Sequence, residues 1–222
     1  IRDRQTVIDA ILELLGKEGT LIVPTFSWDF CNKIPFDVRH SPSKQGIISE
    51  MVRQNPISKR ILHPIYSFSI IGKLSKKLSN LKYESSFGRD SLFGKLREIN
   101  GKILLIGVKF IEANTFIHHV EEVIGTDYRF LKKFEGYVID KNENKTWDYF
   151  YMNVKPLDGT VETNFDRIEK LCESNDITNS IKIGNSTVKL MNAKELFDFT
   201  YKEIQKDPHL LCNLHKKNSK KI

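Results

Sequence analysis

The sequence lacks long hydrophobic runs, and its cysteines are few. No stretch approaches the roughly 18 uninterrupted apolar residues that a membrane-spanning helix needs, so we expect no membrane segment. The three cysteines, Cys31, Cys172 and Cys212, lie far apart and none has a close cysteine partner. This spacing predicts reduced thiols in a cytoplasmic protein and argues against a disulfide framework.

The glycine motifs that bind phosphate groups are also missing. Gly107 follows an apolar run but has no second glycine after it, which excludes the dinucleotide and P-loop fingerprints. Ser67 lacks the Gly-x-Ser-x-Gly elbow of hydrolases, so it is not predicted to be a nucleophile. Ser67 and Thr25, each beside a predicted strand, could donate hydrogen bonds to a ligand oxygen, although such groups are commonly structural.

Composition indicates one globular domain with a basic end. The chain has 222 residues, of which 40% are hydrophobic and 28% charged, a balance typical of a single globular domain. The net charge is +7, and the last ten residues, 213–222, contribute four lysines and no acidic residue, which leaves +3 for the body. We expect this basic tail to be solvated. No alternation of aromatic and basic residues supports nucleic-acid binding, whereas a mildly basic body suits a polyanionic small molecule.

Hydrophobic periodicity predicts alternating helices and strands. In some segments the apolar residues recur at helical spacing. Other segments contain the apolar or alternating runs that are typical of strands. The segment 102–108 is the clearest candidate for a buried strand, and Pro24 is expected to end the hydrogen bonding of the strand before it. The pattern predicts an α/β fold with a mixed central sheet flanked by helices and an antiparallel excursion in the second half. The predicted helices are 3–15, 47–54, 73–81, 92–99, 114–123, 165–173 and 193–206, and the predicted strands are 20–23, 66–71, 102–108, 128–140, 146–154 and two within 181–190.

The most informative segment runs from Asn114 to Glu122, because it places a base and a carboxylate on one helix. Asn114 or Thr115 can cap this helix. His118 and Glu121 are three residues apart and therefore share a helix face. A carboxylate beside an imidazole can orient it and stabilise the cation that forms when it takes a proton. The position of His118 in the first turns also disfavours the imidazolium at rest, because the helix dipole is positive there.

Other interpretations of the same segment remain open. A surface helix can carry a His-x-x-Glu pair with no role at all. His118, His119 and Glu121 also supply ligand types for a metal-dependent hydrolase, but adjacent histidines point in different directions and no His-x-x-x-His face is present. We therefore predict no metal site. His63, which precedes Pro64, could be a ligand or a base, although a histidine in such a turn is commonly structural.

Taken together, the motifs and their order resemble the aminoglycoside 3-N-acetyltransferase family, also called antibiotic N-acetyltransferases. The resemblance covers almost the whole chain, and the combination of motifs is specific although each one is short. The motifs are, in order, 19–26 (Gly-Thr-Leu-Ile-Val-Pro-Thr-Phe), Phe36-Asp37, Ser41-Pro42-Ser43, Gly46, Arg60, His63-Pro64, Ser67, Phe87-Gly88, Ser91, 104–108 (Leu-Leu-Ile-Gly-Val), Asn114-Thr115, His118, Glu121 and Lys206-Asp207-Pro208.

The resemblance implies an enzyme that moves the acetyl group of acetyl-CoA directly to an amine of an amino sugar or aminoglycoside. His118 would then be the general base, with Glu121 as its orienting partner. Thr25 and Ser67 would lie near the thioester or the pantetheine arm. Asp37 and His63 would belong to the substrate side of the site. The implied partner is a small-molecule amine, and the sequence does not indicate an oligomeric state.

The chain departs from the family pattern in two ways. A strand and a loop rich in histidine and serine, which help to hold pantetheine, precede the family's counterpart of the helix 3–15 and have no match here. We therefore expect a single domain without that segment. One expected consequence is weak acetyltransferase activity or none. The alternative to an enzyme is a relative that binds CoA or a sugar without catalysis. Beyond Asp37, Glu121 and Glu122 there is also no acidic cluster for a polycationic aminoglycoside, which favours a nucleotide-linked amino sugar as the acceptor.

Overall fold

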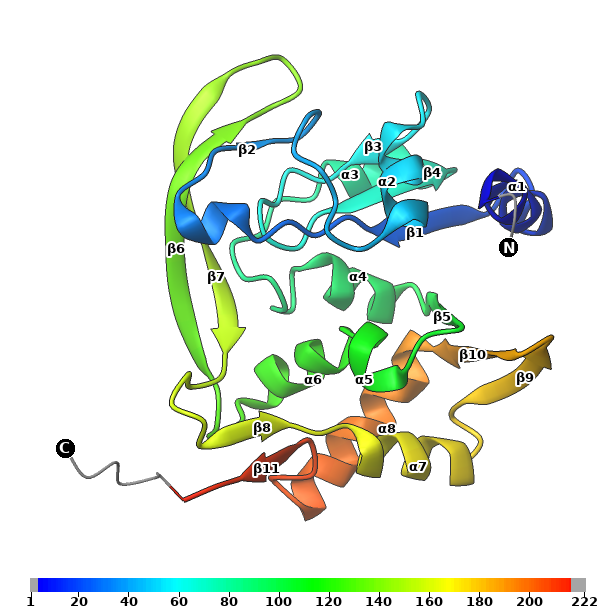
Figure 1. Cartoon of the computed structure of the whole chain (residues 1–222), viewed down its shortest axis with the longest axis vertical. Helices are drawn as coiled ribbons and strands as arrows, with labels where there is room; N and C mark the ends of the chain where they lie inside the picture. The colour runs from blue at the N-terminus through cyan, green and yellow to red at the C-terminus, as the bar shows by residue number, and fades with distance from the viewer. Residues whose placement is uncertain (1–3, 217–222) are drawn as a thin grey trace. The chain divides into compact units, whose positions relative to one another are not determined.

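A computed structural model describes residues 4–216 of the chain. Its contacts divide the chain into two compact units, one made of Ile1–Ser86 and Lys133–Met152 and the other of Phe87–Lys132 and Asn153–Ile222. Strands and helices occur in both units, and one sheet contains a parallel pair beside the antiparallel sheets (Figure 1). The predicted α/β class with a mixed sheet is therefore confirmed. No helix in the described range is both long and apolar enough to cross a membrane.

The first unit contains a three-stranded antiparallel sheet in the order β1-β4-β3. Apolar residues at helical spacing place Ile8 of α1 and Val52 of α2 against Ile71 of β4, where all three are buried. Thr25 directly follows β1, and Ser67 directly precedes β4. The elements are α1 (Arg4–Leu15), β1 (Thr20–Pro24), α2 (Ile47–Gln54), β3 (Lys59–Arg60), β4 (Phe68–Gly72) and α3 (Ser75–Ser79).

Pro24 does not end the pairing of β1, so that prediction is wrong. Pro24 lies opposite Phe68 in the register, and the next residue, Thr25, donates its backbone N–H to Ser67 O at 2.9 Å. β1 is an edge strand with β4 as its one neighbour in this sheet. An edge position tolerates proline because the missing N–H falls on the unpaired side.

A second core of the first unit is aromatic and packs against the long strands β6 and β7. Phe36 of β2 pairs in parallel with Val138 of β6, and Phe30 and Phe150 meet edge to face with ring centroids 5.8 Å apart. The predicted strand pair is confirmed, since β6 and β7 are neighbours in the sheet β2-β6-β7. The elements are η1 (Asp29–Asn32), β2 (Phe36–Asp37), β6 (Phe130–Ile139) and β7 (Lys145–Val154).

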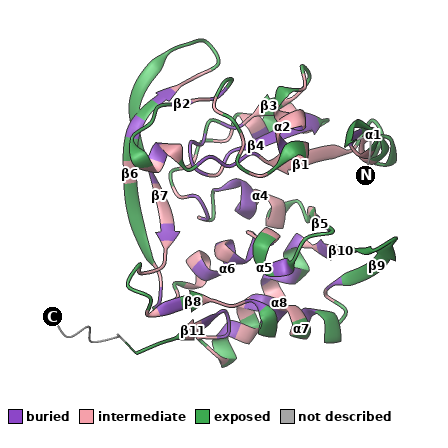
Figure 2. Cartoon of the chain, viewed as in Figure 1, coloured by how far each residue is buried: buried purple, intermediate pink, exposed green. Residues whose placement is uncertain are grey.

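The second unit is organised around α8, which packs against α4, α6, α7 and β10. Leu196, Phe197 and Ile204 form the buried face of α8, in agreement with its helical period. Buried segments of α8 are visible in Figure 2. The observed bounds of α8 equal the predicted ones. The elements are α4 (Leu92–Glu98), β5 (Lys102–Ile106), α5 (Phe110–Ala113), α6 (Ile117–Ile124), β8 (Val161–Thr163), α7 (Asp166–Ser174), β9 (Asn179–Ile183), β10 (Ser186–Asn192), α8 (Ala193–Lys206) and β11 (Cys212–Leu214).

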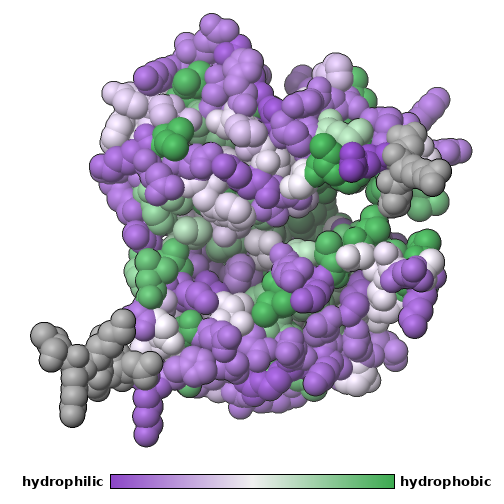
Figure 3. Space-filling view, viewed as in Figure 1, coloured by the Kyte–Doolittle hydropathy of each residue, from purple (hydrophilic) through white to green (hydrophobic). Residues whose placement is uncertain are grey.

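The segment predicted as the clearest buried strand is instead largely exposed. β5 forms one edge of the sheet β5-β10-β9, and Leu105 is the buried residue of this strand, whereas Leu104 and Ile106 are 45% and 41% exposed. The side chains of a strand alternate between the two faces of its sheet, and one face of this sheet is open. Hydrophobic residues accordingly reach the surface among the hydrophilic ones (Figure 3). An apolar run therefore predicted the strand correctly and its burial wrongly.

The first two residues of the predicted basic tail lie in a strand. Asn213 and Leu214 belong to β11, which pairs antiparallel with β8 so that Leu214 lies opposite Val161. Of the four lysines of that tail, Lys216 is described and exposed, and the other three, Lys217, Lys220 and Lys221, lie outside the described residues.

Candidate active site

The helix α6 starts three residues later than predicted. α5 ends at Ala113, and Phe116 occupies the N-cap position of α6 without a side-chain hydrogen bond. The prediction that Asn114 or Thr115 caps this helix is therefore wrong. Asn114 is buried instead, and its amide lies 3.6 Å from the sulfur of Met191. The later start makes His118 the second residue of α6.

His118 and Glu121 lie in contact on one face of α6, as their spacing predicts. His118 Nδ1 is 2.5 Å from Glu121 Oε2, and the carboxylate has no exposed surface. An ionised carboxylate can only accept, so the network assigns the Nδ1 proton as the donor of this bond and leaves the lone pair on Nε2. Nε2 has no hydrogen-bond partner among the described residues, and the His118 side chain keeps 20% of its surface.

Two phenylalanine rings flank the imidazole. The ring centroids of Phe87 and Phe165 lie 5.3 Å and 5.5 Å from that of His118. Both phenylalanines are buried. Together with the Glu121 bond, these rings restrict the orientation of the imidazole. The arrangement can hold a neutral imidazole with one nitrogen free to accept a proton.

Two residues that no sequence pattern had indicated also contact this carboxylate. Tyr128 donates its hydroxyl to Glu121 Oε1 at 2.9 Å, and Arg129 places Nε 2.9 Å from Oε2. Burial alone would raise the pKa of Glu121, but the charge that His118 carries once it is protonated, its hydrogen bond, the charge of Arg129 and the Tyr128 hydroxyl together lower it. Tyr128 and Arg129 follow Glu121 by seven and eight residues and lie beyond the end of α6, so no helical period connects them to it. The available hint was physical: a carboxylate that is buried needs a cation near it, and Arg129 is such a cation.

His119, the neighbour of His118, points to a different part of the unit. Its Nδ1 lies 2.6 Å from Phe87 O, and the residue is buried. Burial lowers the pKa of His119 to about 4. No group of three or more His, Cys, Asp or Glu side chains that could hold a metal ion comes together in the part of the chain that the structure describes.

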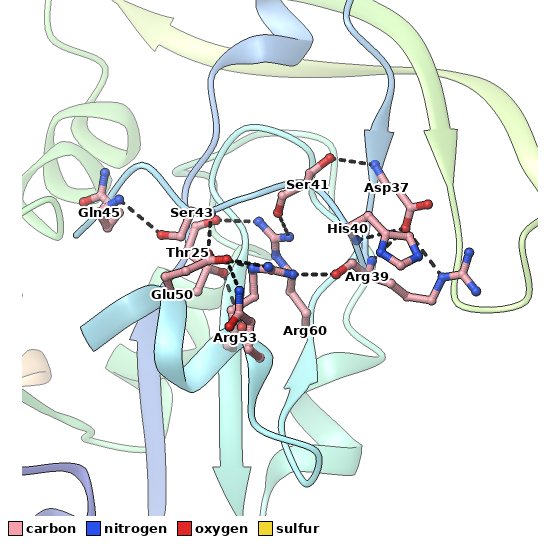
Figure 4. Close-up of polar contacts among 12 residues, drawn as sticks. Thr25, Asp37, Arg39, His40, Ser41, Ser43, Gln45, Glu50, Arg53 and Arg60 are labelled. Carbon is pink, nitrogen blue, oxygen red and sulfur yellow. Dashed lines mark hydrogen bonds and ion pairs between the residues drawn. The ribbon is translucent and has the colours of Figure 1, made fainter. Parts of the chain in front are cut away.

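Thr25 and Ser67 lie together at the ends of β1 and β4, in the first unit. Their hydroxyls are 3.2 Å apart, and Ser67 also donates to Thr25 O at 2.6 Å. Arg60 lies beside them and donates from Nε to Ser67 Oγ. Its terminal nitrogens donate to Thr25 O and Ser41 O (Figure 4). Burial lowers the pKa of Arg60 to about 9. Both hydroxyls are buried and bonded within the unit, so the geometry gives them a structural role, and their contact with a ligand stays a prediction.

The Asp37 side chain accepts hydrogen bonds from the neighbouring backbone. Oδ1 accepts from the N–H groups of Arg39 and His40, at 2.8 Å and 3.3 Å, and the Asp37 N–H donates to Ser41 Oγ (Figure 4). This is the pattern of an aspartate that shapes a turn. The carboxylate retains 18% of its surface, so its predicted contact with a cationic substrate is neither supported nor opposed by this geometry.

His63 lies in the aromatic core of the first unit. It is 1% exposed, its Nδ1 accepts the Tyr66 N–H at 3.0 Å, and burial lowers its pKa to about 3. A side chain without accessible surface cannot touch a substrate in this conformation. The geometry therefore supports the structural interpretation of His63 and gives no support to a substrate contact.

Comparison with known proteins places this chain in a family. The sequence profile described as aminoglycoside 3-N-acetyltransferase matches residues 2–205. The aminoglycoside N(3)-acetyltransferase VII of Streptomyces paromomycinus is 23% identical over 227 residues, covering 88% of this chain and 77% of the relative. The prophage-derived aminoglycoside N(3')-acetyltransferase-like protein YokD of Bacillus subtilis is 26% identical over 219 residues, with the same coverages.

A solved structure shares the fold. The complex titled AAC-IIIb binary with CoASH superposes with a TM-score of 0.79 at 19% identity, covering 93% of this chain and 84% of that one. The fold and the profile define an acyltransferase. The chain belongs to the aminoglycoside 3-N-acetyltransferase family, whose members are N-acetyltransferases with acetyl-CoA as the acyl donor.

Proposed function

We propose that this chain transfers the acetyl group of acetyl-CoA directly to an amine of an aminoglycoside or related amino sugar, with His118 as general base and Glu121 as its orienting partner. The observation that carries the proposal is the 2.5 Å contact between Nδ1 and the buried carboxylate, which leaves Nε2 as the accepting nitrogen. Family membership supplies the donor and the reaction class.

The proposed step moves one proton and exchanges two bonds. The amine nitrogen attacks the thioester carbonyl carbon, and His118 Nε2 takes the amine proton as the C–N bond forms. The C–S bond then breaks, and the imidazolium returns its proton to the departing thiolate of CoA. Glu121 stabilises the transient imidazolium. Holding both substrates together contributes further acceleration through orientation.

The acceptor class rests on the relatives. Two of them carry names for aminoglycoside N-acetylation, which supports an aminoglycoside amine as the acceptor here. The absence of a dense acidic cluster in the sequence favours testing nucleotide-linked amino sugars beside the drugs.

The test is acetyl transfer from acetyl-CoA by the 222-residue chain and its His118→Gln variant. We expect the variant to lose roughly two to four orders of magnitude in kcat with an unchanged unfolding temperature, the range for a positioned base. His215→Gln is a matched control, because His215 is an exposed histidine of the same unit, paired with Glu162. Equal turnover by His118→Gln and the wild type would overturn the role of His118.

The acceptor is decided by mass spectrometry of two panels, one of aminoglycosides and one of nucleotide-linked amino sugars. Acetylated aminoglycosides are the expected product. Binding of CoA in a calorimeter without transfer to either panel would instead identify a binding protein without catalysis.

A further inference from the structure

A buried carboxylate beside a catalytic base creates an electrostatic problem. Glu121 has no exposed surface and lies 2.5 Å from His118. A charge removed from water is weakly screened, so an isolated Glu121 anion would strongly favour the protonated imidazole. An imidazole that already carries both protons cannot accept one from a substrate amine. The orienting partner would then inhibit the base that it orients.

Arg129 lies where it cancels this charge. Its Nε is 2.9 Å from Oε2, the same oxygen that His118 contacts, and its side chain is 7% exposed. Its other guanidinium nitrogens donate to Asn153 O and to Thr163 Oγ1, both at 3.2 Å. These bonds fix the guanidinium at the end of β7 and on β8. A guanidinium stays protonated throughout the physiological range, so the Glu121–Arg129 pair has no net charge.

Arg167 is a second permanent cation in this region: it acts on Cys212 and is itself paired with Asp207. Tyr128 stays neutral, because burial and Glu121 raise the pKa of its phenol. Burial and Glu121 likewise raise the pKa of Cys212 on β11, to about 11. His209, whose ring lies 6.0 Å from that of Tyr128, pairs with the carboxylate of Asp127 at 3.2 Å. Among the described residues, Arg129 is the one arginine or lysine within ion-pair distance of Glu121.

We infer that Arg129 is a positioning residue that keeps His118 unprotonated at neutral pH by neutralising the buried Glu121 carboxylate. The inference rests on the proposed role of His118 as the base. In this arrangement Glu121 supplies direction through its hydrogen bond, and Arg129 limits how far its negative charge favours the imidazolium. When His118 takes the amine proton, the new cation shares Oε2 with Arg129, so the proton is held weakly and returns to the thiolate.

The test is the pH profile of kcat/KM for the wild type, Arg129→Gln and Arg129→Lys. A general base works only when unprotonated, so activity rises with pH through an acidic limb. Removal of the Arg129 charge should move the midpoint of that limb upward by about 1–3 pH units, the usual effect of one nearby charge. Activity lost at pH 7 should return at high pH. Arg129→Lys keeps the charge and should leave the limb near its wild-type position.

A structural role alone predicts a different result. If Arg129→Gln lowers kcat/KM by one factor at every pH and leaves the limb in place, the inference is overturned. A limb that moves equally in Arg129→Lys also overturns it, since charge would then not be the cause. Should Arg129→Gln not fold, Arg129→Met, which removes the same charge, takes its place and should show the same upward movement. An unmoved limb in that variant contradicts the inference.

A second readout separates this inference from the proposed function. NMR titration of the His118 ring in the intact chain needs no substrate, and Arg129→Gln should move its midpoint upward. Full activity of His118→Gln would refute the base while leaving this electrostatic result standing. An inactive His118→Gln together with an unmoved NMR midpoint in Arg129→Gln would refute only the role of Arg129.

Discussion

The imidazole of His63 stacks on the ring of Tyr83, with centroids 4.8 Å apart and planes inclined by 20°. Phe150 closes on it edge to face at 4.9 Å, and Nδ1 accepts the backbone N–H of Tyr66. Aromatic neighbours and a backbone bond are typical of a histidine that stabilises a core. They distinguish His63 from His118, whose Nε2 has no partner among the described residues.

His63→Phe should lower stability. The variant keeps the ring contacts but removes the acceptor of the half-buried Tyr66 N–H, which costs about 1 kcal/mol. Because burial depresses the pKa of His63 to about 3 from 6.5, its contribution is complete above about pH 6.5 and is lost as the pH falls toward 3. Urea unfolding at pH 7 and pH 4.5 should therefore show a larger gap between the variant and the wild type at pH 7.

His63→Asn, which can accept the same N–H, is the matched comparison and should recover part of the stability. A raised KM for the acceptor with an unchanged free energy of unfolding would contradict the structural role and restore the predicted substrate contact.

Glu50→Gln should reveal an acid-sensitive ion pair on α2. The Arg53 side chain, with help from the Ser43 N–H, lowers the pKa of Glu50 from 4.5 to about 2. A depressed carboxyl pKa stabilises the fold above about pH 4.5, and this contribution disappears as the pH falls toward 2. The melting temperature of Glu50→Gln should lie below that of the wild type at pH 7 and approach it near pH 2.5.

Glu13→Gln on the exposed surface of α1 is the control, since no ion pair of Glu13 is present among the described residues. A difference between Glu50→Gln and the wild type that stays constant from pH 7 to pH 2.5 would exclude the Arg53 pair as the cause.

Gly94→Ala should destabilise the second unit although alanine favours helices. Helix propensity alone predicts a gain of about 1 kcal/mol for this change inside α4. A Cβ at position 94 would stand 1.9 Å from Arg89 O and 2.7 Å from Arg89 C, both backbone atoms that cannot rotate away. We expect a net loss of about 3 kcal/mol or more in the free energy of unfolding.

Chemical denaturation measures this loss, with Lys95→Ala as the neighbour control. Lys95 forms an exposed pair with Glu98, so its removal should cost less than about 1 kcal/mol. If Gly94→Ala is as stable as the wild type, α4 and residue 89 do not approach as closely as the structure shows.

Local patterns predicted most elements, because a helix or strand needs only its own period. The apolar spacing of α8 gave both of its ends. The run at 102–108 gave the strand β5 but not its exposure, since burial depends on which strands and helices lie beside it. The same limitation explains the error at Pro24, whose tolerance comes from an edge position.

The sequence by itself determined the family, the α/β class and the contact of His118 with Glu121, because residues three apart on a helix always share a face. Tertiary structure alone decided what surrounds that contact. Tyr128 and Arg129 reach Glu121 only after the chain turns beyond α6, and Asn153 and Thr163 hold the guanidinium from strands further along. The charge and orientation of a buried carboxylate depend on such distant partners, which no local pattern encodes.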